Sequence, residues 1–194
     1  MIEPLGRQHI KAVAALHRAT LTGLLTELGT SATEAFYAGC VGTPLAIGLV
    51  DLRESRLRGF VLGSSRPDAL RRDVLRNNPV GIVSALAAAA LTRPASFLAL
   101  ITHARRSDHG NIDLGAPDLT YLSVAPDARH EGVGASLVHA FGKRIQATGV
   151  AAYELSVDDD NLAGIAFYER LGFRLTGRYR EFGRPRCRYR LVMD

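Results

Sequence analysis

Two glycines and an arginine are spaced so that a backbone can wrap around an anion, and they stand between an apolar strand and an apolar helix. The segment reads Arg129-His130-Glu131-Gly132-Val133-Gly134-Ala135. A helix start carries unpaired N–H groups and the positive end of a dipole, and glycines let that backbone approach a ligand closely. Successive N–H groups form a concave nest, and Arg129 adds a forked, charged donor. The segment predicts a site for a diphosphate, such as that of a nucleotide or coenzyme A.

Other interpretations of this segment can be ranked against that one. A Gly-x-Gly at a helix start also occurs as a simple tight turn, and this alternative stays open. A dinucleotide-binding loop is disfavoured because Leu137 stands where such a loop needs its third glycine. A kinase-type phosphate loop is disfavoured because no Gly-Lys-Ser/Thr follows.

The elements around this loop must bring a second group of residues to it. The strand expected at Leu119–Val124 precedes the loop, and farther along the chain Asn161 is followed seven residues later by Tyr168 and then by Leu-Gly-Phe. Together and in this order, the two segments resemble the acyl-coenzyme A loop and the second signature of the GNAT superfamily of N-acetyltransferases. The resemblance covers residues 118–180 well and residues 66–117 hardly at all.

The resemblance implies a cofactor site. The co-substrate would be acetyl-coenzyme A, with its diphosphate in the loop 129–135. Backbone groups of Leu122, Ser123 and Val124 would pair with the pantetheine arm, and one amide would support the thioester oxygen. The side chain of Asn161 would help to bind the cofactor.

Acetyl transfer to an amine needs an unprotonated amine, a stabilised thioester oxygen and a proton for the leaving thiolate. Tyr168 is the candidate acid, because its phenol can donate to sulfur and the resemblance places this tyrosine beside that sulfur. The alternative is an aromatic side chain packed in the core next to Phe167.

Asp118 is the candidate base, and it lies eleven residues before Arg129. That spacing matches the carboxylate with which some members of the resembling family accept a proton. A turn or strand-start aspartate after Pro117 is an equal alternative. Other members carry a glutamate at the position of Ser156, so that route is absent here. His103 and His109 are weaker candidates.

A run of three aspartates, Asp158 to Asp160, ends the strand that precedes Asn161. These carboxylates are expected either to bind a cationic acceptor or to cap the following helix.

Composition is that of an ordinary globular protein, with 47% hydrophobic and 22% charged residues among 194. Only Cys40 and Cys187 are present, outside any metal-binding spacing, so neither a disulfide framework nor a metal site is predicted. The N-terminus lacks a basic and apolar leader pattern, and we expect a cytoplasmic protein.

The net charge of +5 is uneven, because arginines crowd the C-terminus. We expect a solvated strand edge, on which positive charge blocks unwanted pairing and helps to attract an anionic cofactor. A nucleic-acid-binding surface is the less favoured alternative, supported by the interleaved aromatics Tyr179, Phe182 and Tyr189.

The order of strands and helices predicts one domain over residues 1–194, a three-layer α/β domain around one mixed sheet. The resemblance implies a three-layer α/β/α sandwich in which that mixed sheet is mostly antiparallel. The expected strands are 1–5, 45–52, 57–63, 119–124, 151–157, 173–179 and 187–193. The expected helices are 8–21, one from Ser31 with a capping box to Glu34, one after the loop, and 161–171 with Gly172 as its cap.

Residues 66–117 are predicted to be a helical insertion, because such a gap between strands is too long for a simple loop. A basic helix at 67–75 precedes apolar runs at 79–92 and 95–102, broken by Arg93-Pro94. That interruption argues against a membrane-spanning helix. We expect helices packed over the sheet or over a second subunit, as in a homodimer, and walling the acceptor pocket. Peripheral membrane contact is a minor alternative.

These features favour an acyl-coenzyme A dependent N-acyltransferase that moves an acetyl group directly to a primary amine. The acceptor class stays open between a small amine, an amino sugar, an amino acid and a protein N-terminus. A non-catalytic acyl-coenzyme A-binding regulatory protein is the main alternative, and a nucleic-acid-binding module is the weaker one.

Overall fold

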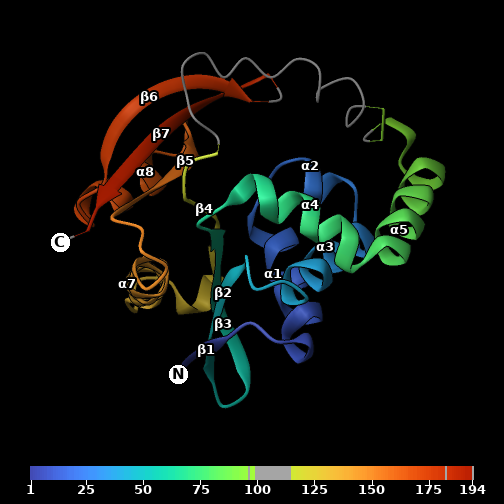
Figure 1. The fold of residues 1–194 in the computed structure, drawn as a ribbon, viewed down its shortest axis with the longest axis horizontal. Helices are drawn as coiled ribbons and strands as arrows, with labels where there is room; N and C mark the ends of the chain where they lie inside the picture. The colour runs from blue at the N-terminus through green and yellow to red at the C-terminus, as the bar shows by residue number, and fades with distance from the viewer. Residues whose placement is uncertain (96, 99–114, 182, 194) are drawn as a thin grey trace.

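The computed structural model describes residues 1–95, 97–98, 115–181 and 183–193. Seven strands form one sheet in the order β1-β2-β3-β4-β5-β7-β6 (Figure 1). They are β1 Ile2–Pro4, β2 Ile47–Arg53, β3 Arg56–Ser64, β4 Asp118–Val124, β5 Ala152–Asp158, β6 Arg174–Glu181 and β7 Arg184–Val192. Only the β4–β5 pair is parallel. The mixed, mostly antiparallel sheet is therefore confirmed.

Helices cover both faces of this sheet, as the three-layer prediction requires. On one face lie α1 Ile10–Thr20, α2 Leu24–Glu27, α3 Thr30–Val41, α4 Pro67–Asn77 and α5 Pro79–Thr92, and on the other lie α7 Val133–Gln146 and α8 Leu162–Arg170 (Figure 1). The α1 side buries Val13, Tyr37 and Phe60 without measurable exposure. This apolar layer fixes β2, β3 and β4 against α1 and α3.

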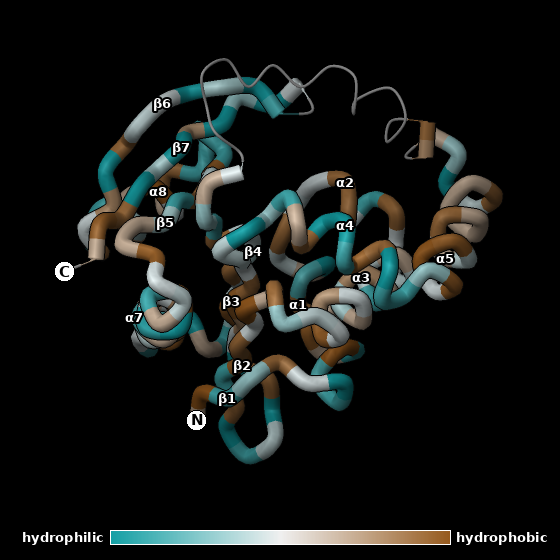
Figure 2. Tube along the Cα trace, viewed as in Figure 1, coloured by the Kyte–Doolittle hydropathy of each residue, from teal (hydrophilic) through white to brown (hydrophobic). Residues whose placement is uncertain are grey.

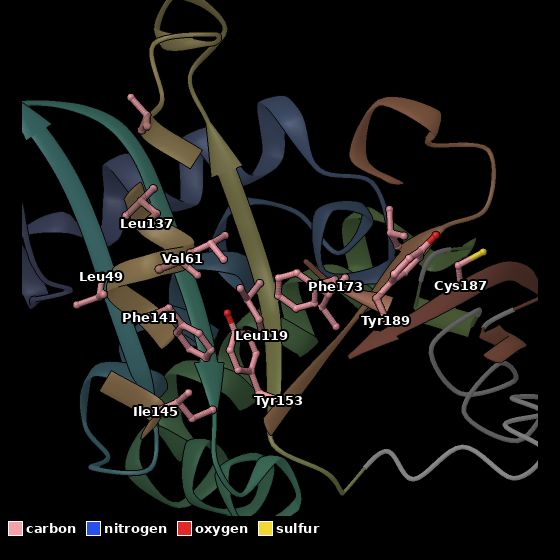
Figure 3. Packing of buried hydrophobic residues seen from close by; sticks show 14 of the residues in the cluster. Leu49, Val61, Leu119, Leu137, Phe141, Ile145, Tyr153, Phe173, Cys187 and Tyr189 are labelled. Carbon is pink, nitrogen blue, oxygen red and sulfur yellow. The ribbon is translucent and has the colours of Figure 1, made fainter. Parts of the chain in front are cut away.

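A second core fills the α7 side and joins the two halves of the sheet. Phe141 of α7 packs edge-on to Tyr153 of β5, which packs edge-on to Phe173 just before β6 (Figure 3). Leu119 of β4 and Tyr189 of β7 belong to the same cluster. These contacts hold β4 and β5 in one rigid body at their base.

The start of α3 differs from its prediction. The helix begins at Thr30, with Gly29 as the N-cap at φ +97° and no side-chain cap. The capping box between Ser31 and Glu34 is therefore wrong, because both residues already lie inside the helix. A glycine reaches that backbone angle without steric cost, so the helix starts one residue earlier than the sequence pattern indicates.

The insertion leaves and rejoins the sheet at one place, since Ser64, the last residue of β3, pairs with Asp118, the first residue of β4. Within it, α5 packs mainly on α3 through Ala85 and Ala89 and not directly over the sheet. Its opposite side exposes several aliphatic side chains, namely Val80, Val83 and Leu91. His103, His109 and most of the apolar run 95–102 lie outside the described residues.

Membrane-spanning length is not reached by any one helix in the described ranges. Helices α4 and α5 approach it only when taken together, and they meet at an angle of 88°.

The arginine-rich C-terminus corrects a prediction. β7 is not an edge strand, because it lies between β5 and β6. Arg188 in its middle is only 3% exposed. The expected solvated edge is therefore wrong for β7, whereas the edge strand β6 is largely hydrophilic (Figure 2). Four of the β7 arginines have carboxylate partners, and these are Arg184, Arg186, Arg188 and Arg190.

Candidate functional site

The sheet opens between β4 and β5. These strands pair only at Asp118 with Glu154 and at Leu119 with Leu155, and then they part. β4 itself continues beside β3 to Val124, after a bulge that leaves one extra residue, Thr120, unpaired. One edge of β4 from residue 120 to 124 therefore faces no strand of the described chain. Its N–H and C=O groups remain available to an extended ligand.

The loop after β4 presents backbone donors toward the same region. His130 and Gly132 have φ of +64° and +78°, and α7 begins at Val133 without a side-chain cap. The first helical bond is donated by the Ser136 N–H to the Gly132 carbonyl. In the part of the chain that the structure describes, the N–H groups from His130 to Ala135 donate no backbone hydrogen bond. This run has the geometry of an anion-binding nest at a helix N-terminus.

The charges beside the loop are already arranged for an anion. Glu131 bonds Arg58 of β3 at 2.8 Å, and Asp127 pairs with Arg56 at 2.7 Å. Both carboxylates are thus neutralised by the β2–β3 hairpin. Arg129 is exposed, and among the described residues it has no ion-pair partner. The net local charge offered to a ligand is positive.

Gly134 marks the point where three elements meet. A Cβ atom placed there would lie 3.2 Å from Cζ of Phe167 on α8 and 3.5 Å from Cγ2 of Val124 on β4. A larger residue would have to push α8 away from the start of α7. The glycine is therefore needed for close packing as well as for access to the backbone.

Helix α8 is fixed at both ends. Asn161 is its N-cap, with Oδ1 accepting from the Gly164 N–H at 2.9 Å. At the other end the N–H of Phe173 donates to the Tyr168 carbonyl, and the N–H of Gly172 donates to the Glu169 carbonyl. Gly172 has a φ of +90°. These two bonds form a Schellman motif, which confirms Gly172 as the cap. The rotation of α8, and with it the direction of Tyr168, is set by both caps.

Tyr168 is packed beside aromatic rings and remains partly exposed. Its ring centroid lies 5.1 Å from Phe167 and 5.6 Å from Phe173. Burial raises the pKa of its phenol, and the negative charge of Asp118 raises that pKa further. The phenol is therefore protonated at neutral pH. No hydrogen bond of its hydroxyl is found among the described residues.

Asp118 is held by a buried arginine. Arg188 Nη1 donates to Asp118 Oδ1 at 2.7 Å, and the Thr120 hydroxyl donates to Oδ2 at 3.1 Å. Burial raises the pKa of Asp118, and the charge of Arg188 opposes that rise. Tyr168 and Asp118 thus share one electrostatic neighbourhood at the point where β4 and β5 part.

The aspartates after β5 do not cap α8, since Asn161 does so. Asp158 instead pairs with Arg184 at 2.8 Å and with Arg186 at 3.3 Å, whereas Asp159 and Asp160 are exposed. A cation-binding role for the exposed pair stays a prediction. No group of three or more metal-binding side chains occurs in the part of the chain that the structure describes.

Sequence reasoning missed several residues of this neighbourhood. Arg188 and Glu154 bond each other at 2.7 Å. Besides burial, the charge of Glu181 raises the pKa of Asp118, and the charges of Glu181 and Asp118 both raise the pKa of Tyr121. A period-two pattern could have revealed the first pair, because Glu154, Ser156 and Asp158 alternate on one strand as the arginines do on another. The register that joins the two strands was not visible in the sequence.

Comparisons with known sequences agree with the resemblance. Residues 81–175 match the acetyltransferase (GNAT) domain family. A stretch of 71 residues is 37% identical to mycothiol acetyltransferase of Paenarthrobacter aurescens (strain TC1). It covers 37% of this chain and 21% of that protein, so the match spans only about a fifth of the relative's length.

Solved structures share the fold over nearly the whole chain. An acetyltransferase matches at a TM-score of 0.66 and 16% identity, with all of both chains covered. Aminoglycoside 6'-acetyltransferase type Ii matches at 0.62 and 17% identity, over 99% of this chain and 96% of that one. Ribosomal-protein-S18-alanine N-acetyltransferase of Escherichia coli matches at 0.60 and 14%, over 100% and 94%. Identities this low carry the fold alone.

Proposed function

We propose that this chain is a member of the GNAT superfamily and transfers an acetyl group from acetyl-coenzyme A to a primary amine. The proposal rests on one observation: the free edge of β4 and the N–H groups at the start of α7 lie next to each other along the chain and can bind one ligand. The free edge of β4 can pair with an extended pantetheine arm, and the run of unbonded N–H groups before α7 can receive a diphosphate. Coenzyme A joins an amide-bearing arm to a diphosphate.

The proposed reaction is a direct transfer in a ternary complex. The amine nitrogen attacks the thioester carbon, the C–N bond forms and the C–S bond breaks. Tyr168 donates a proton to the departing sulfur, and Asp118, directly or through water, accepts the proton that the amine loses. A backbone N–H on the free edge of β4 supports the oxygen while it carries negative charge.

The acceptor is proposed only as a primary amine. The similar proteins are named for different compounds: one is a mycothiol acetyltransferase, one an aminoglycoside 6'-acetyltransferase and one a ribosomal-protein-S18-alanine N-acetyltransferase. Proteins that share only a fold act on different substrates, so the fold does not choose among these acceptor classes.

A second candidate is a regulatory protein that binds acyl-coenzyme A without turnover. The ion pair between Asp118 and Arg188 favours it, since one oxygen of the candidate base is already engaged at 2.7 Å. Both candidates require cofactor binding, and only the first requires release of free thiol.

Charge reversal at the loop tests cofactor binding. Arg129→Glu should weaken the affinity for acetyl-coenzyme A, measured by calorimetry, by roughly tenfold or more, because it places a carboxylate beside the diphosphate. Arg144→Glu is the matched control. Arg144 is also exposed, lies in the last turn of α7, at the opposite end of that helix from the loop, and undergoes the same change of charge. Equal affinities in the two variants would remove the diphosphate from this loop.

A further inference from the structure

Arg188 is buried at the place where β4 and β5 part, and three neighbouring side chains depend on it. Its Nε donates to Glu154 at 2.7 Å, and its Nη1 donates to Asp118 at 2.7 Å and to the Ser156 hydroxyl at 3.0 Å. The side chain is 4% exposed. Nη2 is buried, and no partner for it occurs in the described ranges of the chain. This degree of burial is unusual for an arginine outside a functional or structural network.

The two carboxylates that Arg188 joins belong to different strands. Asp118 and Glu154 are a register pair, one of the two pairs made by β4 with β5 before the strands separate. Arg188 stands on the third strand, β7, opposite Ser156. One guanidinium therefore connects β4, β5 and β7 where the sheet opens. Two acidic side chains share it, and the second of them also has Arg190 at 3.6 Å.

We propose that Arg188 is a positioning residue for the transfer reaction: its guanidinium keeps Asp118 ionised and aims the free lone pairs of that carboxylate into the opening between β4 and β5. The inference rests on the proposed function, because it assigns Asp118 the role of proton acceptor. It goes beyond that function by placing the control of Asp118 on β7, a strand that contains neither the loop nor the proposed acid Tyr168.

The charges around Asp118 make the arginine necessary. The groups that act on it or share its surroundings come from every neighbouring strand and from α8, and they are Glu154, Arg186, Arg188, Glu181, Tyr121 and Tyr168. Without Arg188 the carboxylates of Asp118 and Glu154 would face each other in a buried place. Like charges and burial both favour the protonated form, and a protonated Asp118 accepts no proton.

Geometry favours arginine over lysine here. The Nε and Nη1 atoms reach two carboxylates that stand on different strands, and a guanidinium holds these directions rigidly. An ammonium at the same position keeps the positive charge and loses the fork. The two properties can therefore be separated by substitution.

The test measures the ionisation of Asp118 both with and without turnover. Arg188→Gln should move the carbon-13 carboxyl titration of Asp118, assigned with Asp118→Asn, to higher pH by at least one unit. The acidic limb of the kcat/KM profile should move by the same amount, which a purely structural role would not cause. Arg190→Gln is the matched control, since Arg190 is 51% exposed and more distant, and it should move neither titration by more than about 0.3 unit.

An unchanged Asp118 titration in folded Arg188→Gln overturns the inference. A shifted titration in a protein that releases no thiol with any amine overturns the proposed function and leaves Arg188 as the group that sets the charge of Asp118. If Arg188→Gln does not fold, Arg188→Lys decides. It should keep the titration within half a unit and lower kcat at least tenfold, and wild-type kcat in that variant overturns the inference.

Discussion

Tyr168 and Asp118 lie far apart in sequence and are brought to one place by the fold. Asp118 starts β4, and Tyr168 stands on α8, which is held in rotation by Asn161 and Gly172. The negative charge of Asp118 raises the pKa of Tyr168. This pairing suits a base and an acid of opposite roles, because the charge of Asp118 favours the protonated form of Tyr168 that the reaction needs at its start.

Removal of one hydroxyl tests the acid. Tyr168→Phe keeps the packing against Phe173 and should lower kcat by roughly 10²-fold, with the dissociation constant for acetyl-coenzyme A nearly unchanged. Tyr189→Phe is the control, because it removes a hydroxyl that bonds Glu169 and that belongs to the core side of the sheet. Equal turnover in the two variants would return Tyr168 to a packing role.

A buried histidine makes stability depend on pH. His17 is 1% exposed, its Nδ1 lies 2.8 Å from the Tyr37 hydroxyl, and burial lowers its pKa to about 4. Between pH 6.5 and 4, His17 binds a proton in the unfolded chain but not in the native chain, so the free energy of unfolding falls as pH falls. Relative to pH 7.5, the free energy of unfolding should drop at pH 5 by roughly 2 kcal/mol more in the wild type than in His17→Phe. Parallel losses in urea denaturation of the two proteins would contradict this.

Residue types predicted the loop, and the resemblance made Tyr168 and Asp118 candidates, but neither indicated the arginine that binds the aspartate. The loop and Tyr168 stand in contiguous motifs, whereas Arg188 meets Asp118 only through the register of β4, β5 and β7. One further reason is composition. Arginines are so frequent in this C-terminal segment that a buried one could not be distinguished from its exposed neighbours.

The strands and long helices were predictable because burial imposes a period of two or of 3.6 residues on apolar positions. β5 shows the strict alternation, with Tyr153, Leu155 and Val157 buried. The short helix α2 and the start of α3 were not predictable in this way. Their geometry depends on Gly23 and Gly29 at positive φ, which leave no apolar pattern.

The N-cap of α8 offers a test that separates two roles of one side chain. Asn161→Ala removes the oxygen that accepts from Gly164 and should cost about 1 kcal/mol of stability. Asn161→Asp keeps that oxygen and loses the amide donors. If those donors bind the cofactor, the aspartate variant should retain wild-type stability by thermal unfolding and lose at least fivefold in cofactor affinity by calorimetry. Wild-type affinity in the aspartate variant would leave Asn161 with the cap alone.

At the scale of the whole molecule, the insertion is the part that the resemblance explains least. It leaves the sheet at Ser64 and returns at Asp118, and these two residues are neighbours in register. Whatever the segment 66–117 contacts, its ends are anchored beside the candidate base. This placement favours a role in acceptor choice over a role in cofactor binding.

Substitutions on α4 test that role. Arg72→Ala and Arg76→Ala alter exposed side chains and should change acceptor Michaelis constants, or the order of preferred amines, with the cofactor dissociation constant constant within a few-fold. Lys11→Ala is the control, because Lys11 is an exposed residue of α1. Arg18 on the same helix is unsuitable because its side chain bonds Thr30. A weakened cofactor with an unaltered acceptor profile would place the insertion in the cofactor pocket.

The most direct test of the whole account is release of free thiol from acetyl-coenzyme A in the presence of a panel of primary amines, with acetylated products identified by mass. The proposed function predicts amine-dependent thiol release by the wild type. Gly134→Glu should abolish it, because that change fills the space between Phe167 and Val124 and puts a negative charge beside the diphosphate. Tight binding of acetyl-coenzyme A without thiol release for any amine would contradict it and would identify a regulatory binding protein.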